Sequence, residues 1–76
     1  MNNKRRSRLS AAIGMLSNAA SILDDVCEAE LDCMDNCPEN LQGSERFERM
    51  ESAVDNLNDA LEKLEDAKGY VELAMG

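Results

Sequence analysis

The sequence contains no histidine and no tryptophan, and its 76 residues include only one proline, one phenylalanine and one tyrosine. Without histidine, the chain itself cannot supply histidine-based acid–base catalysis or histidine ligation of a metal. Because aromatic side chains are so scarce, any core has to be aliphatic. Together with few glycines and many Ala, Leu, Met, Glu and Asp residues, these absences predict an all-α protein.

Long apolar runs are also missing. The longest uncharged stretch, LSAAIGMLSNAASIL at residues 9–23, is interrupted by Ser10, Gly14, Ser17 and Asn18. It is too short and too polar to cross a bilayer, and it runs directly into an acidic segment instead of a cleavage site. We therefore expect it to be a helix of a cytoplasmic protein, with no membrane contact.

The known motifs of catalysis are absent as well. The chain has no phosphate-binding glycine loop, no dinucleotide fingerprint and no nucleophile elbow, so we expect neither an enzyme nor a cofactor. The formal net charge is −8, while Lys4, Arg5, Arg6 and Arg8 crowd the first eight residues. An acidic body of this kind repels phosphates and disfavours direct nucleic-acid binding.

The second half of the chain carries a clear helical pattern. Its apolar residues recur at alternating spacings of three and four, from Phe47 and Met50 to Val71 and Met75, with only Lys68 out of character. This heptad pattern predicts a helix over about residues 45–75, with Ser44 as its N-terminal cap. Pairs Glu45–Arg49 and Asp59–Lys63 have the spacing of helical ion pairs. Alanines recur every seven residues beside the apolar row, which favours close packing of a neighbouring helix: Ala53, Ala60, Ala67 and Ala74.

The first half has a helical period too, predicting a helix over about residues 4–35 with Asn3 or Ser7 as its cap. Its apolar row is less definite, because either member of adjacent pairs such as Ala12/Ile13 and Val26/Cys27 fits the helical period. The predicted row then continues to Leu31 and Met34. Pro38 and Gly43 predict a loop over about residues 36–44. A loop this short makes the helices antiparallel, so residues 1–76 are expected to form one coiled-coil-like hairpin in which residue i faces roughly residue 80 − i.

A two-helix hairpin leaves much of each helix in water, so we expect it to dimerise into a four-helix bundle. In the predicted register, the apolar excess of residues 9–23 meets Tyr70 and Leu73 at the open end of the hairpin. Small residues also form a second stripe along the first helix. The predicted contact surface, for a second copy or for another protein, consists of Ser10, Ala12, Gly14, Ser17, Ala19, Ser21, Tyr70 and Leu73.

Three cysteines could bind a metal or stay inert. Cys33 and Cys37 have one plausible ligand spacing, but Cys27 with Asp32 or Asp35 would have to complete the site. We favour unligated thiols, with no metal and no calcium loop. A Cys-ligated metal or redox protein remains an alternative, as does an intermolecular disulfide.

Acidic residues outside the apolar row of the second helix define a second candidate surface. They could simply be solvated, or they could bind a basic groove on a protein partner, as a row of phosphates does. The predicted acidic partner face consists of Glu48, Glu51, Asp55, Asp59, Glu62, Glu65 and Asp66.

Three segments carry a resemblance to a known group of proteins: the basic start MNNKRRSRLS, the turn DNCPENLQGSER, and MESAVDNLNDALEKLEDA after it. On these segments the chain resembles small, acidic helical-hairpin proteins encoded by phages and prophages of Gram-positive bacteria. The resemblance implies a mobile-element protein in the bacterial cytoplasm and assigns no functional site.

The predicted function is therefore protein binding without catalysis. The concrete version is a phage-type accessory protein that binds a host or phage protein, such as a defence or nucleic-acid enzyme, and inhibits or modulates it. The alternative is a structural coiled-coil dimerisation module with no inhibitory role.

Overall fold

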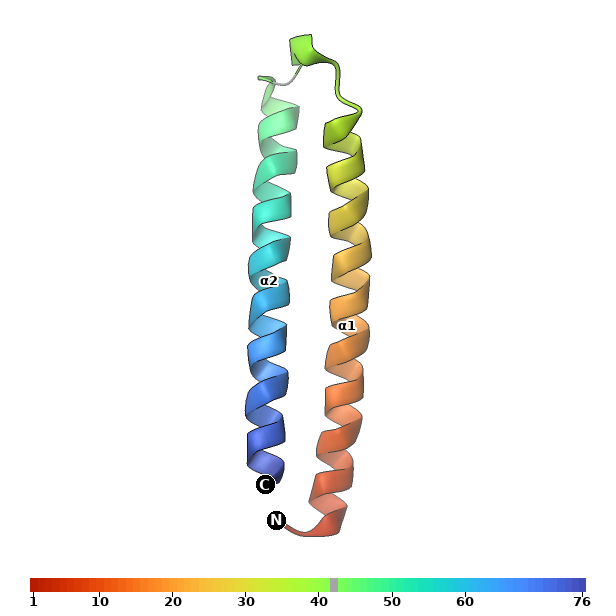
Figure 1. The fold of residues 1–76 in the computed structure, drawn as a ribbon, viewed down its shortest axis with the longest axis vertical. Coiled ribbons are helices and arrows are strands. Elements are labelled where there is room, and N and C mark those ends of the chain that lie inside the picture. Colours follow the sequence, from red (N-terminus) through yellow and green to blue (C-terminus); the bar gives the residue numbers. More distant parts are fainter. Residues whose placement is uncertain (42) are drawn as a thin grey trace.

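The protein is an antiparallel helical hairpin, as predicted (Figure 1). The computed structural model describes residues 1–41 and 43–76. Helix α1 spans Asn3–Asp35, a short 3₁₀ helix η1 spans Glu39–Leu41, and α2 spans Glu45–Met75. The sequence pattern did not predict η1, which lies within the turn. Both termini lie at the end of the hairpin opposite the turn.

Side chains cap the N-terminal ends of both helices. Ser44 caps α2 as predicted, because its Oγ accepts a hydrogen bond from the Phe47 backbone N–H at 3.2 Å. The predicted cap of α1 was wrong, since Asn2, and not Asn3 or Ser7, accepts from the Arg5 N–H at 2.9 Å. At the other end of α1, Asn36 donates from its side chain to the Asp32 carbonyl at 2.9 Å, one residue before Cys37 and Pro38. The helix ends before Cys37, because Pro38 disfavours a helical backbone at the residue that precedes it.

The apolar row of α2 faces α1 along its whole length. Every residue of the predicted row from Phe47 to Met75 is buried or half-buried, and Lys68 occupies its place in the row as a half-buried side chain. The aliphatic stem of Lys68 lies in the row while its ammonium reaches Glu65 at 3.3 Å. The heptad prediction for this helix is confirmed.

The corresponding row of α1 differs from the prediction at its C-terminal end. Cys27 is buried but its neighbour Val26 is exposed, and Leu31 is exposed while Glu30 is half-buried. The row that faces α2 advances by alternating steps of three and four residues. From Leu23 it therefore reaches Cys27, then Glu30 and then Met34. Leu31 is therefore placed on the flank of the helix.

Two hydrogen bonds between the helices show their register. The predicted register placed Ala74 opposite Arg6 and Ala53 opposite Cys27. The structure has Arg6 donating to the Met75 carbonyl at 3.0 Å and the Cys27 thiol donating to the Asn58 side-chain oxygen at 3.6 Å. The predicted register therefore differs from the observed partners by one residue at Arg6 and by five residues, about one and a half helical turns along α2, at Cys27.

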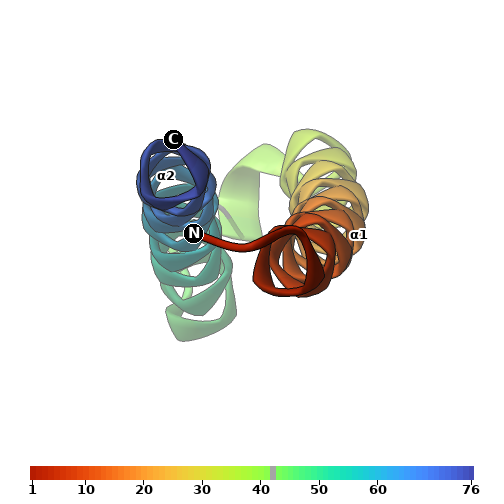
Figure 2. The ribbon, with the colours of Figure 1, turned by 90° about the horizontal axis from the view of Figure 1, so that it is seen from below.

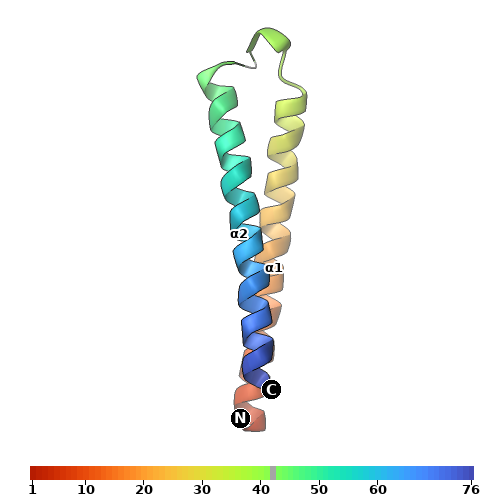
Figure 3. The ribbon, with the colours of Figure 1, turned by 60° about the vertical axis from the view of Figure 1, so that its left-hand side comes forward.

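The hairpin is a rod of 59 × 15 × 13 Å. In Figure 3, α2 lies beside α1 near the turn and in front of it near the termini, so the two helices cross at a shallow angle. Seen from the open end, the first residues reach from α1 toward α2 (Figure 2). Within the described residues, no helix is long and apolar enough to span a bilayer.

Packing of two helices leaves the interior thin. Among the described residues only Cys27 and Val54 are buried, at 4% and 7% exposure. The accessible surface is 5690 Å², whereas a compact monomer of this mass would expose about 4,600 Å². The radius of gyration is 17.4 Å, against about 11 Å for a compact domain of this length. The chain therefore exposes about 1,100 Å² more than a compact fold would.

Candidate functional site

The eight residues predicted to form one contact surface lie on separate sides of the hairpin. Each residue turns an α-helix by about 100°, which places Ala12 and Ala19 on one flank of the α1 core row and Ser10 and Ser17 on the other. Both alanines are half-buried, whereas in the serine stripe Ser17 alone is half-buried and Ser10, Gly14 and Ser21 are exposed.

The two predicted contact residues of α2 lie near its outer surface. Tyr70 and Leu73 are exposed, Leu73 at 77%, and together with Glu65, Asp66 and Gly69 they line a shallow open hollow. All five residues belong to α2, so this hollow does not join the serine stripe of α1. The structure therefore divides the predicted surface into three parts: the serine stripe of α1, Leu73 on the outer surface of α2, and Ala12 and Ala19 with Tyr70 at the edge of their side.

One of these parts continues into a groove between the two helices. Ala19, Ile22 and Leu23 of α1 line it from one side, and Ala60, Lys63 and Leu64 of α2 line it from the other. Apart from Lys63, every lining residue is apolar. Ile22 is 62% exposed, although it is one of the larger aliphatic side chains of the helix.

Seven-residue spacing extends this groove along the hairpin. Ala12 and Arg5 lie seven and fourteen residues before Ala19, respectively, and line a second hollow at the open end. Cys33 lies fourteen residues after Ala19 and shares a third hollow at the turn with Arg46, which is fourteen residues before Ala60. Three hollows on the same rows mark one continuous side of the molecule.

We call this side the alanine face. It consists of two rows from each helix, and within each row the residues are seven positions apart. Its members in α1 are Arg5, Arg8, Ala12, Met15, Ala19, Ile22, Val26, Ala29 and Cys33, and its members in α2 are Arg46, Arg49, Ala53, Asn56, Ala60, Lys63, Ala67, Tyr70 and Ala74.

Charge is distributed very unevenly around the rod. The chain has 16 Asp and Glu residues, yet none of the described ones belongs to the alanine face. Five of the eight Lys and Arg residues do: Arg5, Arg8, Arg46, Arg49 and Lys63. These basic residues stand toward the two ends of the face, with Lys63 beside the central groove. The face therefore combines an apolar middle with basic ends in a protein that is acidic elsewhere.

The seven residues of the predicted acidic partner face are all exposed and all lie outside the alanine face. Within the described residues, only one of them forms an ion pair, Glu65 with Lys68. The predicted pair Glu45–Arg49 is present. The predicted pair Asp59–Lys63 was wrong, since it is not among the ion pairs of the described chain, and Lys63 lines the groove beside Ala60.

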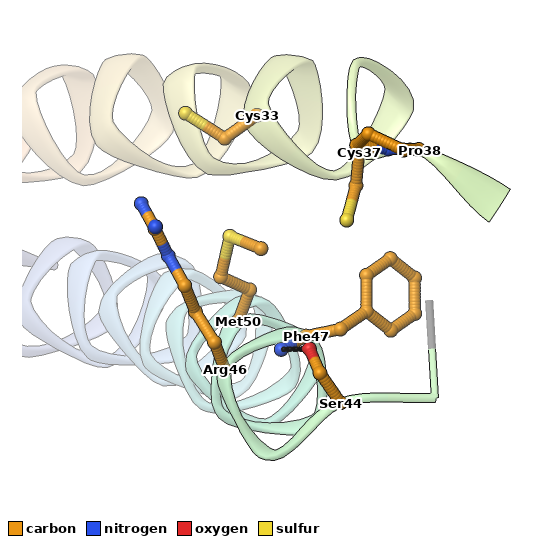
Figure 4. A pocket seen from close by; sticks show the side chains of 7 residues that line it. All are labelled: Cys33, Cys37, Pro38, Ser44, Arg46, Phe47 and Met50. Atoms are coloured by element: carbon orange, nitrogen blue, oxygen red, sulfur yellow. Dashed lines mark hydrogen bonds between the residues drawn. The ribbon is translucent and has the colours of Figure 1, made fainter. Parts of the chain in front are cut away.

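The hollow at the turn brings two thiols near one arginine (Figure 4). It has a volume of about 240 Å³ and is lined by Cys33, Cys37, Arg46, Phe47 and Met50, with Pro38 and Ser44 at its edge. In Figure 4 the Arg46 side chain extends from α2 toward α1, and the Cys37 thiol points toward α2.

The thiols do not gather into a metal centre. All three cysteines are free, and Cys27 is buried between the helices while Cys33 is exposed. Over residues 1–41 and 43–76, no three Cys, Asp or Glu side chains lie in an arrangement that could hold a metal ion. The turn pocket is therefore an apolar recess with thiols at its wall.

The alanine face was only partly visible in the sequence. The alanine row of α2 is recognisable there from its spacing of seven residues, whereas Met15 and Ile22 of α1 were not assigned to any surface and Val26 was predicted in the core row as an alternative to Cys27. Their signal was a spacing of seven and four residues on the flank of the α1 row, together with the absence of acidic residues from that flank.

Comparison with known proteins provides no relative from which a site could be transferred. No protein-family model matches the chain, and neither the curated proteins nor the solved structures include a match to it.

Proposed function

We propose that the chain is a non-enzymatic protein-binding module, an accessory protein of a phage or another mobile element that acts in the bacterial cytoplasm. It binds a host or phage protein and inhibits or modulates it. One observation carries this proposal: the described residues of the rod bury only two side chains and keep large apolar side chains and a row of carboxylates exposed. Extended surfaces of this kind suit contacts with other proteins.

Self-association is the first part of the proposed function. Two hairpins packed along their lengths would form a four-helix bundle and cover the apolar side chains that a single hairpin exposes. Light scattering and native mass spectrometry over a concentration series test this part. We expect twice the 8.4 kDa mass of one chain. A monomer at every concentration would remove self-association from the proposal.

The acidic partner face is the second part. Exposed carboxylates on α2 attract a basic protein surface, and their attraction weakens as salt screens it. The partner is thus expected to carry a basic groove, as defence nucleases and other nucleic-acid enzymes do at their phosphate-binding sites. By occupying such a groove, the chain would inhibit the partner.

A capture experiment with matched charge variants tests the acidic face. The tagged chain is compared with a triple variant on α2 (Asp59→Asn, Glu62→Gln, Asp66→Asn) and with a control triple on α1 (Asp24→Asn, Asp25→Asn, Glu28→Gln). All six residues are exposed, and both triples remove three charges. We expect a bacterial protein to be captured by the wild type and the control but lost by the α2 variant.

The activity of the captured protein then separates the two classes of function. Inhibition or modulation by the wild-type chain supports an accessory protein. A stable dimer that captures no protein, or capture that ignores the α2 charges, would instead favour the structural alternative, a dimerisation module with no inhibitory role.

A further inference from the structure

We propose that a second copy of the chain docks on the alanine face with its long axis reversed, so that the open end of each hairpin lies against the turn of the other. This inference rests on the self-association proposed above. It adds the surface, the neighbour that covers it and the orientation of that neighbour.

The area to be covered matches what a dimer needs. A stable protein interface buries about 800 Å² on each partner, and the interfaces of permanent homodimers bury more. The hairpin exposes 5690 Å², about 1,100 Å² beyond a compact chain of its mass. One contact that buries this excess along the length of the rod would bring the exposed surface of each chain to the level of a compact monomer of its mass.

The composition of the alanine face suits a second pair of helices. Seven of its residues are alanines, six of them in the two rows that border the groove, and short side chains let a neighbouring helix approach closely. The large residues next to them are exposed, Met15 at 70% and Ile22 at 62%. In a face-to-face dimer these side chains would enter the opposite groove and leave water.

The opposite flank of the hairpin is unsuitable for a second copy. There the serine stripe of α1 stands beside a row of α2 that includes Glu51, Glu65 and Glu72, all exposed. Two such flanks would bring like charges together in an interface, which costs free energy. The alanine face is the long side of the described chain on which two copies meet without opposing carboxylates.

Charge along the rod determines the orientation. The open half, residues 1–19 and 58–76, has six Lys and Arg against five Asp and Glu, whereas residues 20–57 have two against eleven. The open half is thus +1 and the turn half −9. A parallel pair would place both −9 halves together, while a reversed pair places each beside a +1 half.

Specific residues are positioned to benefit from that reversal. Arg5 and Arg8 stand on the face at the open end. In the reversed pair they come near the turn of the second copy, where Arg46 and Arg49 lie on the face and Asp32 and Glu45 border it. A parallel pair would also place arginines against arginines at both ends, so the carboxylates that border the face distinguish the two orientations. Asp32 is exposed and lies outside the two ion pairs of the described chain, whereas Glu45 is exposed but already pairs with Arg49 of its own helix.

Variants that place a glutamate on different sides of the rod test the surface. Met15→Glu and Ile22→Glu put a charge on the alanine face, while Ser21→Glu and Leu73→Glu put the same charge on the serine stripe and on the outer surface of α2. All four residues are exposed, so each variant keeps the hairpin core. Circular dichroism checks helix content, and sedimentation equilibrium gives the dimer dissociation constant.

We expect Met15→Glu and Ile22→Glu to raise the dimer dissociation constant at least about tenfold, because each would bury a carboxylate in an apolar groove. Ser21→Glu and Leu73→Glu should leave it within about threefold. A wild-type monomer would overturn both this inference and the self-association. A dimer that survives both face variants, or that Ser21→Glu dissociates, would overturn only the assignment of the surface.

Spin labels at the turn test the orientation. Asn40→Cys is exposed and lies near the tip of the hairpin, and Cys27→Ala, Cys33→Ser and Cys37→Ser remove the other thiols. In the reversed dimer the two labels lie at opposite ends, so pulsed electron resonance should give a separation comparable with the 59 Å length. A separation near the 15 Å width of one hairpin would overturn the reversed arrangement.

Discussion

The thiol of Cys27 in α1 donates a hydrogen bond to the side-chain oxygen of Asn58 in α2, with 3.6 Å between sulfur and oxygen. Cys27 is the most buried residue of the described chain, at 4% exposure, and Asn58 is exposed. The bond therefore runs from the thin core to its edge. It joins the two helices on the turn side of the middle of the rod, where Val54 is the other buried side chain of the described residues.

Replacing Cys27 by alanine should destabilise the hairpin mainly through lost packing. A thiol is a weak donor, so most of the loss comes from removing a buried sulfur; we expect about 1–2 kcal/mol in the free energy of unfolding. Urea denaturation at one protein concentration measures it. Asn58→Ala is the matched variant and should cost about 0.5 kcal/mol, as expected for one weak hydrogen bond.

The two variants together test the bond itself. A double-mutant cycle should give a coupling free energy below about 1 kcal/mol, because the two residues share only this contact. If Asn58→Ala destabilised the protein as much as Cys27→Ala, the hydrogen bond and not the packing would hold the helices together at this point.

Truncation of Val54 should show how thin the core is. Val54 is 7% exposed, and Val54→Ala should cost about 1–2.5 kcal/mol, a large share of the stability of so small a domain. Leu73→Ala removes a larger side chain that is 77% exposed, and it should change stability by less than about 0.5 kcal/mol. Thermal melts followed by circular dichroism compare the two. Equal losses would contradict the observed packing.

Removal of the Ser44 hydroxyl should weaken the start of α2. Ser44→Ala leaves the Phe47 N–H without its partner and should cost about 1 kcal/mol, whereas Ser44→Gly should cost less than that. Ser52 lies in the exposed interior of the same helix, so Ser52→Ala should instead stabilise by a few tenths of a kcal/mol through helix propensity, about 0.3–0.5. Opposite signs for these two Ser→Ala changes are the expected result.

The sequence predicts the buried row of α2 more completely than that of α1. In α2, the large apolar residues from Phe47 to Leu64 stand one at a time, with only alanines beside them, and so leave one possible row; the structure has that row from Phe47 to Met75. In α1, adjacent apolar residues such as Val26 and Cys27 both fit the period. Only packing against α2 decides between them, and it buries Cys27.

The same ambiguity explains the prediction of the contact surface. The sequence does not determine which residues of α1 face α2, and so it does not determine whether Ser17 and Ala19 lie on the same flank. Both were therefore assigned to one predicted surface. Once Cys27 and Leu23 face α2, the rows of Ala19 and Ile22 fall on the groove side with Ala60. The acid-free character of that side appears only when the rows of both helices are combined.

Added salt should stabilise the hairpin, since repulsion among its carboxylates opposes folding. Residues 20–57 hold eleven Asp and Glu against two Lys and Arg, and the described chain has only two ion pairs, Glu45–Arg49 and Lys68–Glu65. Raising the ionic strength from 0.01 to 0.1 M shortens the screening length from about 30 to about 10 Å. Repulsion between carboxylates on successive turns then weakens more than the attraction within these short-range pairs does.

The melting temperature should therefore rise with salt at a fixed protein concentration. The rise should be smaller in a variant that carries Glu48→Gln, Glu51→Gln and Asp55→Asn. A melting temperature that falls with salt would mean that attraction, within one hairpin or between the unlike halves of two, outweighs this repulsion.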